Sequence, residues 1–195
     1  DRPPLMLRAS VIDPASDKPF EFTVVVNHLK SLLGYDDPKR MEGVRLKKKL
    51  QAEFLAKFVQ ERQKADPNEN IALIGDFNAF QFNDGILDVV GTIKGKPAGK
   101  DEVLNSSSDL VDPDMVDLVD LINQSERYSY TYRDEGNAET IDHIIVSAAF
   151  RKYVAGFGFG RLNADFPEVY RNDDRRPERY SDHDPAIAYF MLPAP

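Results

Sequence analysis

Two apolar, strand-like segments on either side of a long helical pattern constrain the fold of this chain more than any other feature. Residues 20–29 and 71–74 are rich in Val, Ile and Phe, as buried strands are. Between them, apolar residues from 37 to 64 recur at helical spacing, and the opposite face is charged. A strand, helix, strand unit of this kind is the basis of α/β domains. Because no break in composition divides the chain, the sequence predicts one α/β domain over residues 1–195.

Other segments extend the predicted sheet structure. Residues 5–12 are predicted to form a hairpin with 20–29, because Asp and Pro residues crowd the gap between them. Residues 128–132, 140–146, 153–159 and 186–192 are further predicted strands. Asn83 is expected to cap a short helix that runs through Val90 and is followed by a loop rich in Gly and Lys.

The composition excludes several classes of protein. The chain has no cysteine, so a disulfide framework, a thiolate nucleophile, a zinc finger and an iron–sulfur cluster are excluded. Any bound metal must use oxygen or imidazole ligands. No stretch approaches the roughly 20 apolar residues of a membrane span. The net charge of −8 argues against a dedicated basic clamp for nucleic acid, but it allows an enzyme with local basic loops and a bound divalent cation.

The three histidines of the chain lie in polar clusters at or beside the ends of predicted strands. They are His28 in Asn-His-Leu-Lys-Ser, His143 in Ile-Asp-His-Ile and His183 in Ser-Asp-His-Asp-Pro. A single histidine in such a place is more often structural than catalytic. A fourth cluster places the carboxylate of Asp76 two residues from the carboxamide of Asn78, just past a buried strand. A turn cap would explain that cluster alone, but the four clusters together favour an active site.

The last cluster contains two carboxylates that flank an imidazole. Asp182, His183 and Asp184 are consecutive, and such a segment can supply a metal ligand and a general acid or base. Asp142 could orient that imidazole from a neighbouring strand. The alternative is an ordinary surface turn before Pro185.

In this order, the four clusters resemble the second half of the endonuclease/exonuclease/phosphatase superfamily, the DNase I-like metal-dependent phosphodiesterases. The similarity runs from the strand that carries His28 to the strand after Pro185. Residues 27–31 (Asn-His-Leu-Lys-Ser) and 162–167 (Leu-Asn-Ala-Asp-Phe-Pro) are most similar to bacterial extracellular nucleases. The resemblance implies a DNase I-like four-layer α/β sandwich, of which this chain supplies mainly the C-terminal sheet and its helices.

The resemblance also implies a role for each matching residue. His28 matches the histidine that hydrogen-bonds the scissile phosphate. Asp76 and Asn78 match the pair that handles the attacking water and the phosphate, with Asp76 also near the metal. Asp182 matches a metal-ligand aspartate, and His183 matches the histidine beside phosphate and water.

The resemblance also bears on Asp142, on His143 and on the metal. Asp142 matches the aspartate bonded to the catalytic histidine, whereas His143 occupies a position that varies among relatives and is interpreted as structural. Hard cations prefer oxygen ligands and offset charge in the transition state of phosphodiester hydrolysis. The expected cofactor is therefore Mg²⁺ or Mn²⁺, with Ca²⁺ as a further option.

The chain departs from the family pattern at two positions that relatives carry on early strands. Superfamily members carry an asparagine and a metal-binding glutamate on early strands, and we find neither match here. We therefore expect that further residues precede Asp1 in the native protein and that the isolated chain is inactive or weak. The sheet face that includes Val24, Val26 and Leu73 is expected to need a cover, either from a missing N-terminal half or by self-association.

The resulting hypothesis is a metal-dependent phosphodiester hydrolase, most simply a nuclease that cleaves DNA and/or RNA by metal- and histidine-assisted water attack. The alternatives are a phosphatase or phospholipid phosphodiesterase of the same superfamily and a non-catalytic binding relative. Lys30, Arg175 and Arg176 are expected to bind substrate phosphates, although Asp173 and Asp174 partly neutralise the arginines. The likeness to extracellular nucleases predicts an extracellular or periplasmic location.

Overall fold

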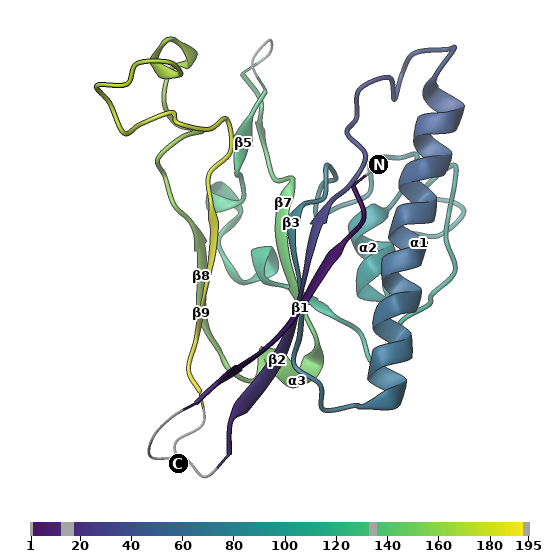
Figure 1. Cartoon of the computed structure of the whole chain (residues 1–195). Coiled ribbons are helices and arrows are strands. Elements are labelled where there is room, and N and C mark those ends of the chain that lie inside the picture. The colour runs from purple at the N-terminus through teal and green to yellow at the C-terminus, as the bar shows by residue number, and fades with distance from the viewer. Residues whose placement is uncertain (1, 13–17, 133–135, 193–195) are drawn as a thin grey trace.

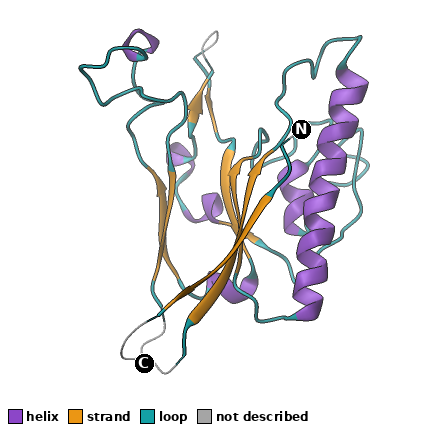
Figure 2. Ribbon diagram, viewed as in Figure 1, coloured by secondary structure: helices purple, strands orange, loops and turns teal. Residues whose placement is uncertain are grey.

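A computed structural model describes residues 2–12, 18–132 and 136–192 of the chain, and it confirms the mixed α/β class. The described residues form three layers (Figures 1 and 2). A five-stranded sheet lies in the middle, helices cover one of its faces, and a two-stranded ribbon lies on the other. The turns predicted at 13–17 and 134–135 fall outside the described residues.

The central sheet has the strand order β1-β2-β3-β7-β4. Strands β2 and β3 are parallel and joined through helix α1, and the other neighbours are antiparallel. The predicted hairpin is present, since the whole of β1 pairs with residues 20–26 of β2. The bounds of these elements are Leu5–Val11 (β1), Phe20–His28 (β2), Met41–Ala65 (α1), Ile71–Asp76 (β3), Val116–Asp117 (β4) and Asp142–Val146 (β7).

Shorter elements connect and cover this sheet. Strands β5 and β6 form a small ribbon, and β8 pairs with β9. The bounds of the strands and α-helices are Val89–Lys94 (α2), Tyr130–Thr131 (β5), Ala138–Glu139 (β6), Ala148–Arg151 (α3), Val154–Phe159 (β8) and Ala186–Phe190 (β9). Three 3-10 turns span Leu118–Leu121, Gln124–Glu126 and Glu168–Tyr170.

The main core lies between α1 and the sheet. Val25, Leu73 and Ile145 are partners in register on three adjacent strands, and all three are buried against the helical side. Helix α1 begins at Met41 rather than at the predicted residue 37, because the carbonyl of Asp37 first accepts the backbone N–H groups of Arg40 and Met41 in a turn. The predicted strand, helix, strand unit is therefore present, with its helix starting one turn later.

The opposite face of the sheet packs on the β8–β9 ribbon. Phe157 and Phe190 of the ribbon join a second apolar cluster built around Ala72, Val146 and Phe150, and the rings of Phe150 and Phe190 stack with centroids 4.3 Å apart. The ribbon covers this face only in part.

The expectation of an exposed sheet face holds for some of its residues. Val26 is 42% exposed and Val24 is half-buried. The expectation was wrong for Leu73, which is fully buried in the main core because its side chain points towards α1. None of the helices in the described part of the chain is long and apolar enough to cross a membrane.

His143 is a buried anchor in this fold, in agreement with its structural interpretation. Its Nδ1 lies 2.8 Å from Oδ2 of Asp117, and its Nε2 lies 2.8 Å from the carbonyl oxygen of Ala79. His143 and Asp117 are both fully buried. Burial alone would lower the pKa of His143, but the charge of Asp117 and the two hydrogen bonds outweigh burial and raise that pKa. The His143 ring therefore joins β7, β4 and the loop after β3.

We expect His143→Phe to lower the free energy of unfolding by about 3–5 kcal/mol, because it leaves the Asp117 carboxylate buried without its partner. The double variant His143→Phe with Asp117→Leu removes both charged groups and should recover part of this loss. Urea denaturation of the two variants and the parent chain measures the difference. A double variant no more stable than the single one would contradict a buried ion pair.

Candidate active site

Three polar residues lie side by side at one end of the central sheet. In the register of β2, β3 and β7, His28 is the partner of Asp76, and Asp76 is the partner of Asp142. The carboxyl ends of β2 and β3 meet the start of β7 at this edge, at the top of the sheet in Figure 1. On each strand, the residue of this polar row lies three positions from a buried residue. The buried residues are Val25, Leu73 and Ile145. The register of the core therefore sets the register of the site.

A glycine permits this close arrangement. Gly75 has φ +122°, and a Cβ at its position would collide with the backbone oxygen of Asn27 on β2. L-residues with side chains rarely adopt that conformation. Gly75 therefore lets β3 approach β2 just before the strand delivers Asp76.

Asp76 and Asn78 form a compact pair after β3. The backbone N–H of Asn78 donates to Oδ1 of Asp76 at 2.7 Å, and its Nδ2 donates to Oδ2 of Asp76 at 3.0 Å and to the carbonyl of Leu29. Asn78 has a φ of 47°, in the left-handed region that Asn tolerates better than most residues. Burial raises the pKa of Asp76, the N–H of Asn78 opposes that rise, and the charge of Asp142 adds to it.

His28 faces this pair from β2. Its Nε2 lies 3.4 Å from Oδ2 of Asp76, while its Nδ1 accepts a hydrogen bond from the guanidinium of Arg2. A guanidinium can only donate, so the neutral ring carries its proton on Nε2. That N–H is directed into the site and can donate to an anionic oxygen.

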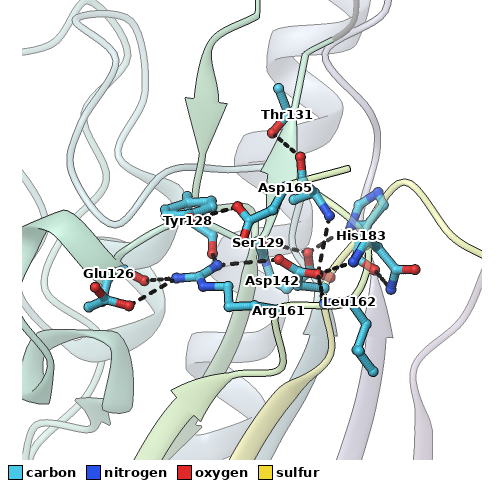
Figure 3. Close-up of polar contacts among 12 residues, drawn as sticks. Glu126, Tyr128, Ser129, Thr131, Asp142, Arg161, Leu162, Asp165 and His183 are labelled. Atoms are coloured by element: carbon cyan, nitrogen blue, oxygen red, sulfur yellow. Dashed lines mark hydrogen bonds and ion pairs between the residues drawn. The ribbon is translucent and has the colours of Figure 1, made fainter. Parts of the chain in front are cut away.

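His183 reaches the same end of the sheet from the loop before β9. Its Nδ1 lies 2.7 Å from Oδ2 of Asp142, and that carboxylate also accepts a 2.7 Å hydrogen bond from Oγ of Ser129 (Figure 3). Burial would lower the pKa of His183, but the hydrogen bond and charge of Asp142 outweigh it and raise that pKa. With Nδ1–H held by Asp142, Nε2 of the neutral ring can accept a proton.

The loop that carries His183 is held by its neighbour in sequence. Asp184 is buried, and its Oδ1 accepts the backbone N–H groups of Leu162, Asn163 and Ala164 at 3.1, 2.7 and 3.2 Å. Its Oδ2 lies 3.3 Å from Arg161. The side chain of Asn163 in turn donates to the carbonyl of His183 at 2.7 Å. Asp184 therefore fixes the backbone around His183, and its carboxylate is occupied by these donors.

Arg161 connects this loop to residues 126–129, the segment before β5. Its guanidinium lies over the ring of Tyr128, 3.6 Å from the centroid, and donates to the Tyr128 carbonyl (Figure 3). The Tyr128 hydroxyl donates to Asp165. The network anchors the segment from Tyr128 to Ser129, so that Ser129 is placed against Asp142.

Other predicted site residues lie at the margin. The ammonium of Lys30 donates to backbone and hydroxyl oxygens of Ser31 and to the carbonyl of Leu33, so it folds back on its own loop. Arg175 is bound to Asp173 at 2.7 Å. Arg176 lies over the ring of Tyr170 and 3.6 Å from Asp173. These arginines are exposed, but each already has an acidic partner.

Asp182 lines a cleft beside the polar row of His28, Asp76 and Asp142. The cleft has a volume of about 990 Å³, and Asn78, Tyr130 and His183 line it as well. Arg171 lies 3.7 Å from Asp182, so it is the arginine of this loop that reaches the carboxylate expected to bind metal.

The described residues do not by themselves form a complete metal centre. In residues 2–12, 18–132 and 136–192, no group of three or more His, Cys, Asp or Glu side chains is arranged to hold a metal ion. Asp76 accepts two hydrogen bonds from Asn78, and Asp182 pairs with Arg171. A divalent cation at this site would therefore need ligands in addition to these two carboxylates.

The structure adds three residues to the site that sequence reasoning did not assign to it. Ser129 binds Asp142, while Asn163 and Asp184 hold the loop of His183. Asn163 and Asp184 lie in the motifs at 162–167 and 181–185, and these motifs are the sequence signal that could have identified them. Ser129 lies in the predicted strand 128–132, where nothing in the sequence marks it as a site residue.

Comparison with known proteins gives a result only at the level of structure. No known family profile matches the chain, and no curated protein sequence matches it. Among solved structures, the chain is similar to the 3'-5' exonuclease NExo from Neisseria meningitidis, with 17% identity, a TM-score of 0.53, and coverage of 97% of this chain and 72% of that one. The 3' phosphatase NExo from Neisseria bound to a product DNA hairpin gives 19% identity, a TM-score of 0.50 and the same coverage.

A third structure belongs to an archaeal protein. The AP endonuclease from Archaeoglobus fulgidus matches with 14% identity and a TM-score of 0.53, over 88% of this chain and 62% of that one. These structures have the DNase I-like fold of endonuclease/exonuclease/phosphatase proteins, and the present chain has that fold over the part it spans.

We expect Asp184→Ala to lower the free energy of unfolding by about 2–4 kcal/mol, because three backbone N–H groups lose a charged acceptor. The amide protons of Leu162, Asn163 and Ala164 should then exchange with solvent faster than in the parent chain. Asp165→Ala is the matched control, since Asp165 is exposed and binds the Tyr128 hydroxyl. Equal exchange rates in the two variants would contradict the role given to Asp184.

Proposed function

We propose that this chain carries the catalytic residues of a phosphodiester hydrolase, most simply a nuclease. The observation that carries the proposal is that the His183–Asp142 pair lies at the same sheet edge as His28, Asp76 and Asn78. A histidine oriented by a carboxylate supplies a general base. N–H donors that face it supply stabilisation for an anionic transition state. The DNase I-like fold supports the proposal.

In this proposal each residue has a defined task. His183 accepts a proton at Nε2 from the attacking water as the new oxygen–phosphorus bond forms. Asp142 stabilises the imidazolium that results. The bond from phosphorus to the leaving ester oxygen breaks, and that oxygen takes a proton from solvent. The N–H of His28 and the amide of Asn78 donate to nonbridging oxygens of the phosphate, whose negative charge would otherwise repel the nucleophile.

A divalent cation, Mg²⁺ or Mn²⁺, is part of the proposal, with Asp76 and Asp182 as the carboxylates that this chain offers. Such a cation would supply positive charge at the phosphate when it is bound. Hydrolysis is therefore expected to require a divalent cation and to stop when a chelator is added.

A nucleic acid is the proposed substrate. One structure of similar fold is described as bound to a DNA hairpin, and the cleft beside His183 contains the aromatic residues Phe80, Tyr130 and Tyr132, on which bases can stack. A phosphatase or a phospholipid phosphodiesterase remains the second candidate, because the same residues serve any phosphate ester. Parallel assays on plasmid DNA, RNA and a phosphoinositide, with and without Mg²⁺, separate the candidates.

An extracellular or periplasmic location is also a prediction, tested by fractionation of the producing cells.

We expect Asp76→Ala, His183→Ala and His28→Ala each to reduce kcat/KM by about 10²-fold or more, because each removes a group that acts on the transition state. The substrate is a soluble phosphodiester, and the protein is expressed with any residues that its gene encodes ahead of Asp1. His143→Phe is the control and should cost far less in rate at a temperature where it is folded. Near-normal turnover in any two of the three alanine variants would overturn the assignment.

We expect the double variant Arg175→Glu, Arg176→Glu to bind polynucleotide more weakly and with a shallower dependence on salt. Fewer phosphate contacts release fewer counterions, and the slope of log K against log salt should fall by about 2. Hydrolysis of bis(p-nitrophenyl) phosphate should be unchanged. If both substrates are affected equally, the variant has damaged the neighbouring loop of Asp182 and His183, and the arginines are not a substrate contact.

A further inference from the structure

A lysine is buried directly beneath the candidate active site. Lys48 lies on α1 and is only 1% exposed, and it is among the largest fully buried side chains of the protein. Moving an ammonium group out of water costs several kcal/mol unless partners compensate for the lost hydration. A lysine at this position therefore needs a specific explanation.

The ammonium of Lys48 joins two loops that carry site residues. Its Nζ donates to the carbonyl of Lys30 at 3.0 Å and to the carbonyl of Asn78 at 2.6 Å. Lys30 lies two residues after His28, at the end of β2, and Asn78 lies two residues after Asp76, at the end of β3. One side chain from α1 thus contacts the backbone that follows each of these strands.

A second contact comes from the same side of the helix. Gln51 is three residues after Lys48, and its Oε1 accepts the backbone N–H of Lys30 at 2.9 Å. Residues three apart face the same way on a helix. The backbone N–H and the backbone carbonyl of Lys30 are therefore both bound by side chains of α1, and the backbone carbonyl of Asn78 is bound by Lys48.

Burial and the nearby carboxylates act on the Lys48 ammonium in opposite directions. Burial lowers the pKa of Lys48 to about 8, although the charges of Asp84 and Asp76 oppose that change. An apolar residue of the same length would avoid the cost of burying a charge, but it would leave both carbonyl groups without a donor.

We propose that Lys48 is a positioning residue for the phosphodiester hydrolysis proposed above: its buried ammonium holds the loops after β2 and β3 together, so that His28 and Asn78 face one phosphate group. The role rests on the proposed function. Lys48 acts through the backbone of Lys30 and Asn78. An error of about 1 Å in the placement of reacting groups can cost about 10²-fold in rate.

The absence of cysteine from the chain allows a test that changes only the ammonium. Lys48→Cys is unfolded, alkylated with either 2-bromoethylamine or 1-bromopropane, and refolded. The first reagent creates a side chain of nearly the length of lysine with its ammonium, and the second creates a side chain of the same length with a methyl group in its place. The protein is expressed with any residues that its gene encodes ahead of Asp1. Parent protein taken through the same unfolding and alkylation is the reference.

The readout is kcat and KM for bis(p-nitrophenyl) phosphate, at a temperature where circular dichroism shows both forms to be folded. We expect the aminoethyl form to match the reference within about threefold, and the propyl form to lose about tenfold or more in kcat with little change in KM. Gln63→Leu is the matched control. Gln63 is also buried on α1, but it binds the carbonyl of Pro113, so its loss should change stability and leave kcat unaltered.

Each of the other outcomes overturns the positioning role, and one of them also overturns the proposed function. Equal kcat for the aminoethyl and propyl forms overturns the positioning role and leaves the proposed function intact. If the propyl form and the variant Lys48→Met, made without an unfolding step, both fail to fold, Lys48 is a folding residue and the positioning role is overturned. If the reference protein shows no hydrolysis with Mg²⁺ or Mn²⁺, the proposed function fails, and the role of Lys48 fails with it.

Discussion

The register between β2, β3 and β7 is the constraint on which the rest of the candidate site depends. Val25, Leu73 and Ile145 are aligned across these strands and buried against α1, and His28, Asp76 and Asp142 are aligned three residues further along. Because side chains alternate between faces, a slip of one residue would turn the buried row towards the opposite face. The hydrophobic core therefore aligns the polar row.

Each of the two carboxylates at this edge has its own polar partners. Asp76 and Asp142 are partners in register, and two carboxylates so placed would repel each other. Each has a histidine beside it, His28 for Asp76 and His183 for Asp142. Asn78 and Ser129 add hydrogen bonds to the two carboxylates. The arrangement keeps two acids near a position where a phosphate, itself an anion, is proposed to bind.

The supports of the site come from segments far apart in the chain. Asp184 holds residues 162–164, and Arg161 binds the segment that carries Ser129. The ammonium of Lys48 meets the loops after β2 and β3 from the helical side. The imidazoles of His28, at the end of β2, and of His183, on the loop before β9, are thus supported by contacts from both sides of the sheet. Such support is the condition for precise placement of reacting groups. The loop proposed to contact the remainder of a substrate, by contrast, lies at the rim and carries ion pairs of its own, such as Arg175 with Asp173.

Features that depend on neighbouring residues could be predicted from the sequence. The runs of Val, Ile and Phe, the helical spacing after residue 37 and the polar clusters around the three histidines are readable from neighbours in the chain, and they predicted the strand, helix, strand unit, the hairpin and the residues that gather at one sheet edge. Local signals were less reliable for short elements. The short helix expected from Asn83 to Val90 instead spans Val89–Lys94, because the side chain of Asp88 accepts the N–H of Gly91 and caps a later start.

The partners of each polar group, by contrast, depend on how distant segments pack together. Asp184 belongs to the motif that suggested a metal ligand, but it is buried against three backbone N–H groups from a segment 20 to 22 residues away. Lys48 looks like a solvated helical lysine in the sequence, whereas it is buried below the site. The energy of a charged group depends on its burial and on its partners in space, and neither is encoded by adjacent residues. The sequence therefore determined which groups are available, and the packing of α1 and the β8–β9 region against the sheet decided which of them form the site.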